Sequence, residues 1–117
     1  MTDKIHKIAD YYGYEVQSRQ LIEEMAELTK AINKLWRCEN GLIDQLVYMP
    51  PELRRSMYLK SVIEEIADVE ICLEYVKYLL DIATEDVDKV KEAKVERELN
   101  RIAERELDKR NLSERNN

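Results

Sequence analysis

The chain has 117 residues, which is enough for one ordinary domain and too few for two. It contains only two glycines and two prolines, and because sheets joined by tight turns need more of both, the composition predicts an all-α fold. Its 25 acidic and 19 basic residues give a net charge of −6, which argues against binding to the phosphate backbone of a nucleic acid.

The sequence also bears on the compartment. Its two cysteines, Cys38 and Cys72, are too few for a disulfide framework, so we interpret them as small buried hydrophobic residues in a reducing environment. No apolar run approaches the roughly 20 residues needed to cross a bilayer, and residues 1–6 do not resemble a signal peptide. We therefore expect a cytoplasmic protein with no membrane partner.

The first half of the chain predicts two helices and a connection. A short helix over residues 3–12 should end at Gly13, because glycine tolerates the left-handed conformation of a helix end. A longer helix should begin near Glu15 and bury a stripe with alternating spacings of four and three. The residues of this stripe are Leu21, Met25, Leu28, Ile32 and Leu35. The apolar segment 42–49, between Asn-Gly and Pro-Pro, is predicted to pack as a lid or a helical turn.

The second half predicts two more helices. The third either begins at Pro51 and kinks, or begins afresh near Ser61, where Ser61 and Glu64 have the spacing of a capping box. Its body, residues 62–82, is the most hydrophobic part of the chain and places residues 62, 66, 69, 73, 76 and 80 in one stripe. A fourth helix should run from Thr84 to about residue 112, followed by a frayed tail, 113–117. The prediction is a single domain, 1–112, built as a four- to five-helix bundle.

Two pairs of acidic residues lie at the edges of the predicted apolar surfaces. Glu24 and Glu27 flank the stripe of the second helix, and Glu65 and Asp68 fall inside the apolar arc of the third. If these helices pack antiparallel, the four carboxylates meet in an oxygen-only pocket, which needs a cation to offset the loss of hydration. Such ligands suit Mg²⁺ or Mn²⁺. The alternative is that charged helices contain such pairs by chance.

The same residues carry a resemblance to a known family, the MazG-like all-α nucleoside triphosphate pyrophosphohydrolases, which are related to the dimeric dUTPases and dCTP pyrophosphatases. Residues 23–28, EEMAEL, resemble the family's Glu-Glu-x-x-Glu motif, and residues 65–69, EIADV, resemble its Glu-x-x-Asp motif. The connection between the two motifs is longer than is usual for the family. The resemblance implies Mg²⁺-dependent hydrolysis of nucleoside triphosphates to monophosphate and pyrophosphate by a homodimer or homotetramer.

By resemblance and by position on the helical wheel, the metal ligands would be Glu24, Glu27, Glu65 and Asp68. The ions would neutralise the triphosphate and supply an activated water, which is what phosphoryl chemistry chiefly requires. Glu24 and Glu23 are the candidate catalytic residues. Glu23 lies farther round the helix, so it would either orient a water or assist as a base, or else simply face solvent.

Several other side chains are candidates for binding the substrate. Lys34, and the three basic residues Lys94, Arg97 and Arg101 that share one face of the fourth helix, could contact phosphates. The alternative for each is an ordinary surface ion pair. Trp36 would either stack on a base or pack in a core or an interface. The alternatives to an enzyme are a non-catalytic helical partner protein and a nucleotide sensor.

Overall fold

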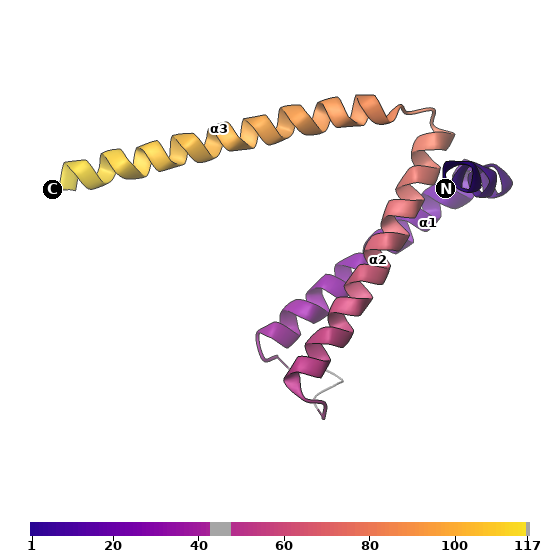
Figure 1. Ribbon diagram of the computed structural model, residues 1–117, viewed down its shortest axis with the longest axis horizontal. Helices are drawn as coiled ribbons and strands as arrows, with labels where there is room; N and C mark the ends of the chain where they lie inside the picture. The colour runs from indigo at the N-terminus through magenta and orange to yellow at the C-terminus, as the bar shows by residue number, and fades with distance from the viewer. Residues whose placement is uncertain (43–47, 117) are drawn as a thin grey trace. The chain divides into compact units, whose positions relative to one another are not determined.

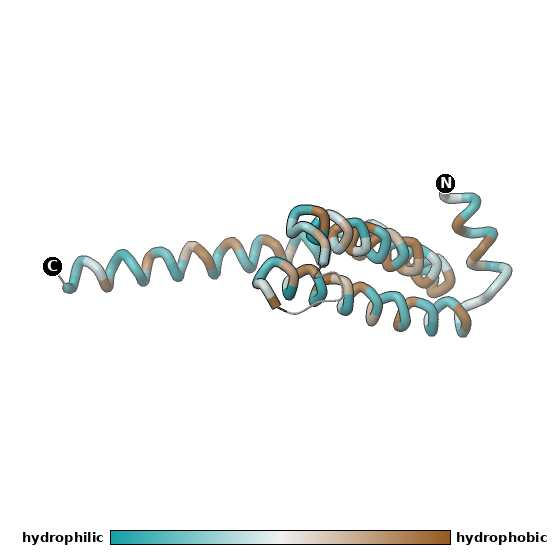
Figure 2. The backbone as a smooth tube through the Cα atoms, turned by 90° about the horizontal axis from the view of Figure 1, so that it is seen from below, coloured by the Kyte–Doolittle hydropathy of each residue, from teal (hydrophilic) through white to brown (hydrophobic). Residues whose placement is uncertain are grey.

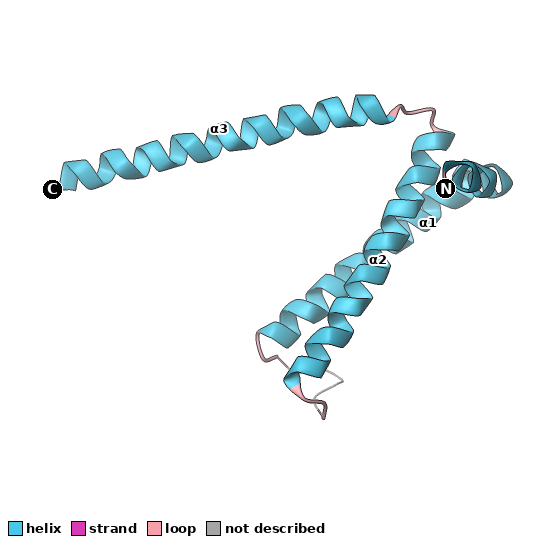
Figure 3. Ribbon diagram, in the orientation of Figure 1, coloured by secondary structure: helices cyan, strands magenta, loops and turns pink. Residues whose placement is uncertain are grey.

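The computed structural model describes residues 1–42 and 48–116, which form three helices and no strand (Figures 1 and 3). They are α1 (Thr2–Glu39), α2 (Pro51–Leu79) and α3 (Thr84–Asn116). The all-α class is thereby confirmed. The described residues form three helices and not the predicted four to five, because the two predicted N-terminal helices join across a kink as α1. The chain divides into two units, Met1–Asp81 and Ile82–Asn117. None of the described helices is long and apolar enough to cross a membrane.

A sharp kink divides α1 at Gly13, where the backbone leaves the helical region with φ 83° and ψ 170°. The predicted break at this glycine is confirmed, although helical structure resumes directly after it. An added Cβ would meet nothing within 4 Å, so space does not demand the glycine. The positive φ does, because a side chain at this position would be strained.

The segment before the kink, residues 2–12, is fixed to the end of α2. The hydroxyl of Tyr78 donates a hydrogen bond to Oδ2 of Asp10 over 2.9 Å. The ring of His6 stacks on that of Tyr78 with 3.8 Å between centroids, and Ala9 is fully buried. The start of the chain is therefore part of the first unit's packing.

The rest of α1 packs antiparallel against α2 in a hairpin (Figure 1). The side chains between the two helices, which we call the seam, recur at alternating spacings of four and three, as in a coiled coil. The seam residues of α1 are Gln17, Leu21, Glu24, Leu28, Ala31, Leu35 and Cys38. Those of α2 are Tyr58, Val62, Glu65, Val69, Cys72, Val76 and Leu79.

The predicted stripes agree with the seam only in part. Met25 and Ile32 are about half exposed, and so are Ile66 and Leu73, because each of them follows a seam position by one residue. Glutamates occupy two of the seam positions, so hydrophobic periodicity alone predicted stripes that are partly one residue out of register with the seam. The apolar residues that follow the seam positions form a second, exposed apolar stripe on each helix of the hairpin.

The course of α2 decides between the two predicted starts. It begins at Pro51, a first helical position where a missing N–H is harmless, and continues through Ser61. The capping-box prediction is wrong, because the Ser61 hydroxyl donates to the carbonyl oxygen of Met57 within the helix. The helix ends at Leu79, before the predicted residue 82, and Asp81 adopts φ 57°. Most of the predicted lid, 42–49, lies outside the described residues.

The second unit consists mainly of α3, along which polar and apolar residues alternate (Figure 2). None of its residues is buried. It extends to Asn116, so the tail predicted to fray is helical to that residue. Ion pairs one turn apart, such as that between Arg101 and Glu98 at 3.2 Å, support the helix locally.

Candidate metal centre

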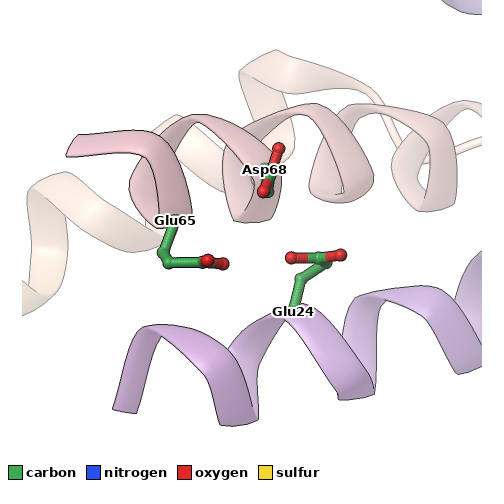
Figure 4. Close-up of side chains that lie close together, drawn as sticks. All are labelled: Glu24, Glu65 and Asp68. Carbon is green, nitrogen blue, oxygen red and sulfur yellow. The ribbon is translucent and has the colours of Figure 1, made fainter. Parts of the chain in front are cut away.

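Three carboxylates converge across the hairpin: Glu24 from α1, and Glu65 and Asp68 from α2 (Figure 4). Each offers an oxygen atom, and the three oxygens lie within 4.8 Å of one another. Residues 41 positions apart in the sequence are thus joined in one cluster. We call these three residues the carboxylate cluster.

The cluster forms because glutamates occupy the seam. Glu24 and Glu65 stand where the heptad pattern of each helix otherwise places an apolar residue, so both are half-buried. Asp68 follows Glu65 by three residues and is exposed at the edge of the same contact. Two facing glutamates in a core layer lose hydration and repel each other, so they are an unfavourable choice for stability alone.

Glu65 is the most perturbed member of the cluster. Its Oε2 atom is buried, and within the described residues it has no hydrogen-bond partner. Burial raises the pKa of Glu65, and the negative charges of Glu24 and Asp68 raise it further. Hydrogen bonding between the carboxyl groups of Glu65 and Glu24 acts in the same direction. In the absence of a cation, Glu65 therefore keeps its proton to a higher pH than an isolated glutamate does.

Glu24 is held in place by a residue that sequence reasoning missed. The amide nitrogen of Gln20 donates a hydrogen bond of 2.8 Å to Oε1 of Glu24, from one turn earlier on α1. Hydrogen bonds of this kind orient the ligands of metal sites. Gln20 precedes the predicted ligand Glu24 by four residues, and this spacing could have indicated the hydrogen bond from the sequence.

The remaining predicted acids lie outside the cluster. Glu27 is exposed and forms an ion pair with Lys30 at 3.6 Å, although its charge still contributes to the raised pKa of Glu65. Glu23 is exposed on α1. Three of the four predicted ligands are therefore brought together, and Glu27 lies beside them with a different partner.

The donor set fits a hard divalent cation. Three carboxylates supply oxygen ligands alone, which suits Mg²⁺ or Mn²⁺. The buried thiol of Cys72, one turn beyond Asp68, has a pKa raised by burial and by the charges of Glu24 and Asp68. Because a thiol coordinates metal as the thiolate, a raised pKa disfavours Cys72 as a ligand. The unpaired Oε2 of Glu65 is the atom that a cation would satisfy.

The predicted substrate-binding residues are more scattered. Lys34 and Trp36 are exposed on α1, ten and twelve residues beyond Glu24, which is about 15 and 18 Å along the helix axis. Lys94, Arg97 and Arg101 lie on α3, in the second unit. Arg101 forms the ion pair with Glu98, as its surface interpretation expects.

Comparisons with known proteins found no match to any protein-family model, any curated protein or any solved structure.

Proposed function

We propose that this protein is a Mg²⁺-dependent nucleoside triphosphate pyrophosphohydrolase, with Mn²⁺ as a possible substitute ion. The observation that carries the proposal is the convergence of Glu24, Glu65 and Asp68 across the hairpin seam, with a buried oxygen of Glu65 lacking a partner. The motif resemblance of residues 23–28 and 65–69 supplies the reaction class. Both lines rest on the same acidic residues.

The position of the cluster supports metal binding over a purely structural role. An apolar side chain at residue 24 or 65 would continue the seam and avoid the repulsion between buried carboxylates. A bound divalent cation removes that repulsion and satisfies the unpaired oxygen. Acids that serve only solubility would lie on the outer surface of the helices, as those of α3 do.

In the proposed reaction, water attacks a phosphorus atom of the triphosphate, and the products are a nucleoside monophosphate and pyrophosphate. Bound Mg²⁺ would neutralise phosphate charge and favour the ionised form of the attacking water. Glu24, oriented by Gln20, and Glu65 with Asp68 would hold the ion between the two helices. The exposed Glu23 would accept the proton or orient the water. The phosphate contacts predicted from the sequence, Lys34, Lys94, Arg97 and Arg101, stay predictions.

The exposed stripes of the hairpin favour a homodimer or homotetramer. The residue after each seam position is often apolar, and in an antiparallel pair these residues turn to the same side of both helices. We call this surface the hairpin face. Its exposed apolar residues are Ile22, Met25, Ile32, Trp36, Ile63, Ile66, Leu73 and Leu80. The same face would serve a non-catalytic partner protein, which is the second candidate function, and it gives Trp36 an interface role.

The first experiment is pyrophosphate release from a panel of ribo- and deoxyribonucleoside triphosphates, with and without Mg²⁺. We expect metal-dependent turnover in the wild type and a loss of about 100-fold or more in Glu65→Gln, because removing a ligand should exceed the 10- to 100-fold effect of removing a supporting group. The matched control is Glu64→Gln, which changes the exposed neighbour and should retain activity.

Mn²⁺ binding, followed by electron paramagnetic resonance, gives a readout independent of turnover. The wild type and Glu64→Gln should bind the ion, and Glu65→Gln should not. Mn²⁺ binding without turnover of any nucleotide would overturn the proposed enzymatic activity and favour the nucleotide sensor. Equal binding by all three proteins would overturn the metal site itself.

A further inference from the structure

A cavity of about 370 Å³ lies in the first unit, beside the kink of α1. Its lining comes from both sides of Gly13 and from α2, namely Ile8, Tyr12, Val16, Gln17, Gln20 and Tyr75. It is open to solvent, and Tyr12 and Val16 in its lining are each about half exposed. The lining combines aliphatic and aromatic side chains with two amides, so it suits a ligand that has both apolar surface and polar atoms.

Gln17 is the most buried residue of this lining. Gln17 is only 4% exposed, although it occupies a seam position. Within residues 1–42 and 48–116, no hydrogen bond joins its side chain to another group. The amide atoms are not among the fully buried polar atoms that lack a partner, so they keep contact with the open space of the cavity. The amide is therefore available to a ligand in the cavity.

The cavity adjoins the carboxylate cluster through Gln20. This side chain lines the cavity and also donates the hydrogen bond to Glu24. Gln17 precedes Glu24 by seven residues on the same helix, which is two turns or about 10 Å. A ligand that fills the cavity and extends along α1 would thus present its other end to the cluster.

We propose that this cavity binds the nucleobase of the substrate, and that Gln17 recognises the base through a neighbouring donor and acceptor on its edge. The inference rests on the proposed function and deepens it. Tyr12 and Tyr75 supply aromatic surface for a planar ring, and a glutamine amide pairs with an adjacent donor and acceptor of a base. The base is thereby assigned to Gln17 and not to Trp36, which lies 19 residues farther along α1, about 28 Å along the axis.

The cavity spans the kink of α1. Residues 8 and 12 before Gly13 line the same cavity as residues 16 and 17 after it. The hydrogen bond between Tyr78 and Asp10 and the stacking of His6 on Tyr78 hold the first segment against α2. Base recognition is thus coupled to the packing of the start of the chain.

The test compares substrates with and without a base in the wild type and in Gln17→Leu. The baseless probes are inorganic triphosphate and ribose 5-triphosphate. For the best nucleotide we expect kcat/KM to fall about 10- to 100-fold in Gln17→Leu, as is typical when hydrogen bonds to a substrate are lost from a buried site. For the baseless probes kcat/KM should be unchanged. Asn33→Leu, which alters an exposed amide on the same helix, should leave both unchanged.

Calorimetric binding of the matching nucleoside monophosphate, measured without metal, separates this inference from the proposed function. Binding that is lost in Gln17→Leu and kept in Asn33→Leu supports the cavity, even if no triphosphate is hydrolysed and the proposed activity fails. Hydrolysis with an unchanged ranking of bases in Gln17→Leu would overturn the cavity and leave the activity standing. Absence of both binding and hydrolysis would overturn the two together.

Discussion

The hairpin of α1 and α2 and the long helix α3 both contain many acidic residues, and the two regions place them differently. On α3 every residue is at least partly exposed, and acids such as Glu98 and Glu106 pair with a base one turn away. In the hairpin, Glu24 and Glu65 replace apolar residues in the seam and face each other. The comparison teaches that an acid's neighbours, and not its presence in a motif, decide whether it has a perturbed pKa and a potential chemical role.

The largest effect in this comparison is expected from removing the support of the cluster. Gln20→Leu should lower Mn²⁺ affinity about 10- to 100-fold, because loss of a hydrogen bond that orients a metal ligand has this typical effect. Titration calorimetry with Mn²⁺ would measure it. Asn33→Leu is again the control, and an unchanged affinity in Gln20→Leu would show that the 2.8 Å hydrogen bond does not organise the site.

A second effect concerns pH. The folded protein holds the pKa of Glu65 above its ordinary value, through burial first and the neighbouring acids second. Between the unfolded and folded pKa values the native state binds more protons, so its stability falls as pH rises through this window. The metal-free protein should therefore be stabilised by acidification from neutral pH towards the ordinary glutamate range of about 4.3.

Urea denaturation in a chelator at a series of pH values would test this. Other acids also titrate, so the relevant quantity is the difference between the wild type and Glu65→Gln, which should lack this part of the slope. Excess Mg²⁺ should weaken or reverse the slope, because the ion and the proton compete for the carboxylate. Parallel curves for wild type and variant would contradict the shift.

The smallest effect is expected on α3. Glu98→Gln removes the partner of Arg101, and because both side chains are about half exposed, the free energy of unfolding should change by less than about 0.5 kcal/mol. Thermal denaturation would measure this change, and metal affinity should be unaffected. A large loss of stability would show that α3 has packing partners in the assembled protein that make this ion pair matter.

Much of the fold was predictable from local signals. Sparse glycine and proline indicated helices, Gly13 marked the break in α1, and Pro51 was a sound start for α2. The errors were at places where two local signals competed. Ser61 resembled a cap although nothing interrupted the helix around it, and the polar end of α3 resembled a tail although its residues continue a helix to Asn116.

The sequence by itself determined the helical class and singled out the acids at residues 24, 65 and 68, because helical periodicity places each residue on a known side of its own helix. Only the tertiary structure decided which acids meet. The relative register of α1 and α2 depends on packing along the whole seam, and it joins Glu24 to Glu65 and Asp68 while leaving Glu27 with Lys30. The same packing, together with the kink at Gly13, buries Gln17 beside a cavity, which the pattern of a single helix does not encode.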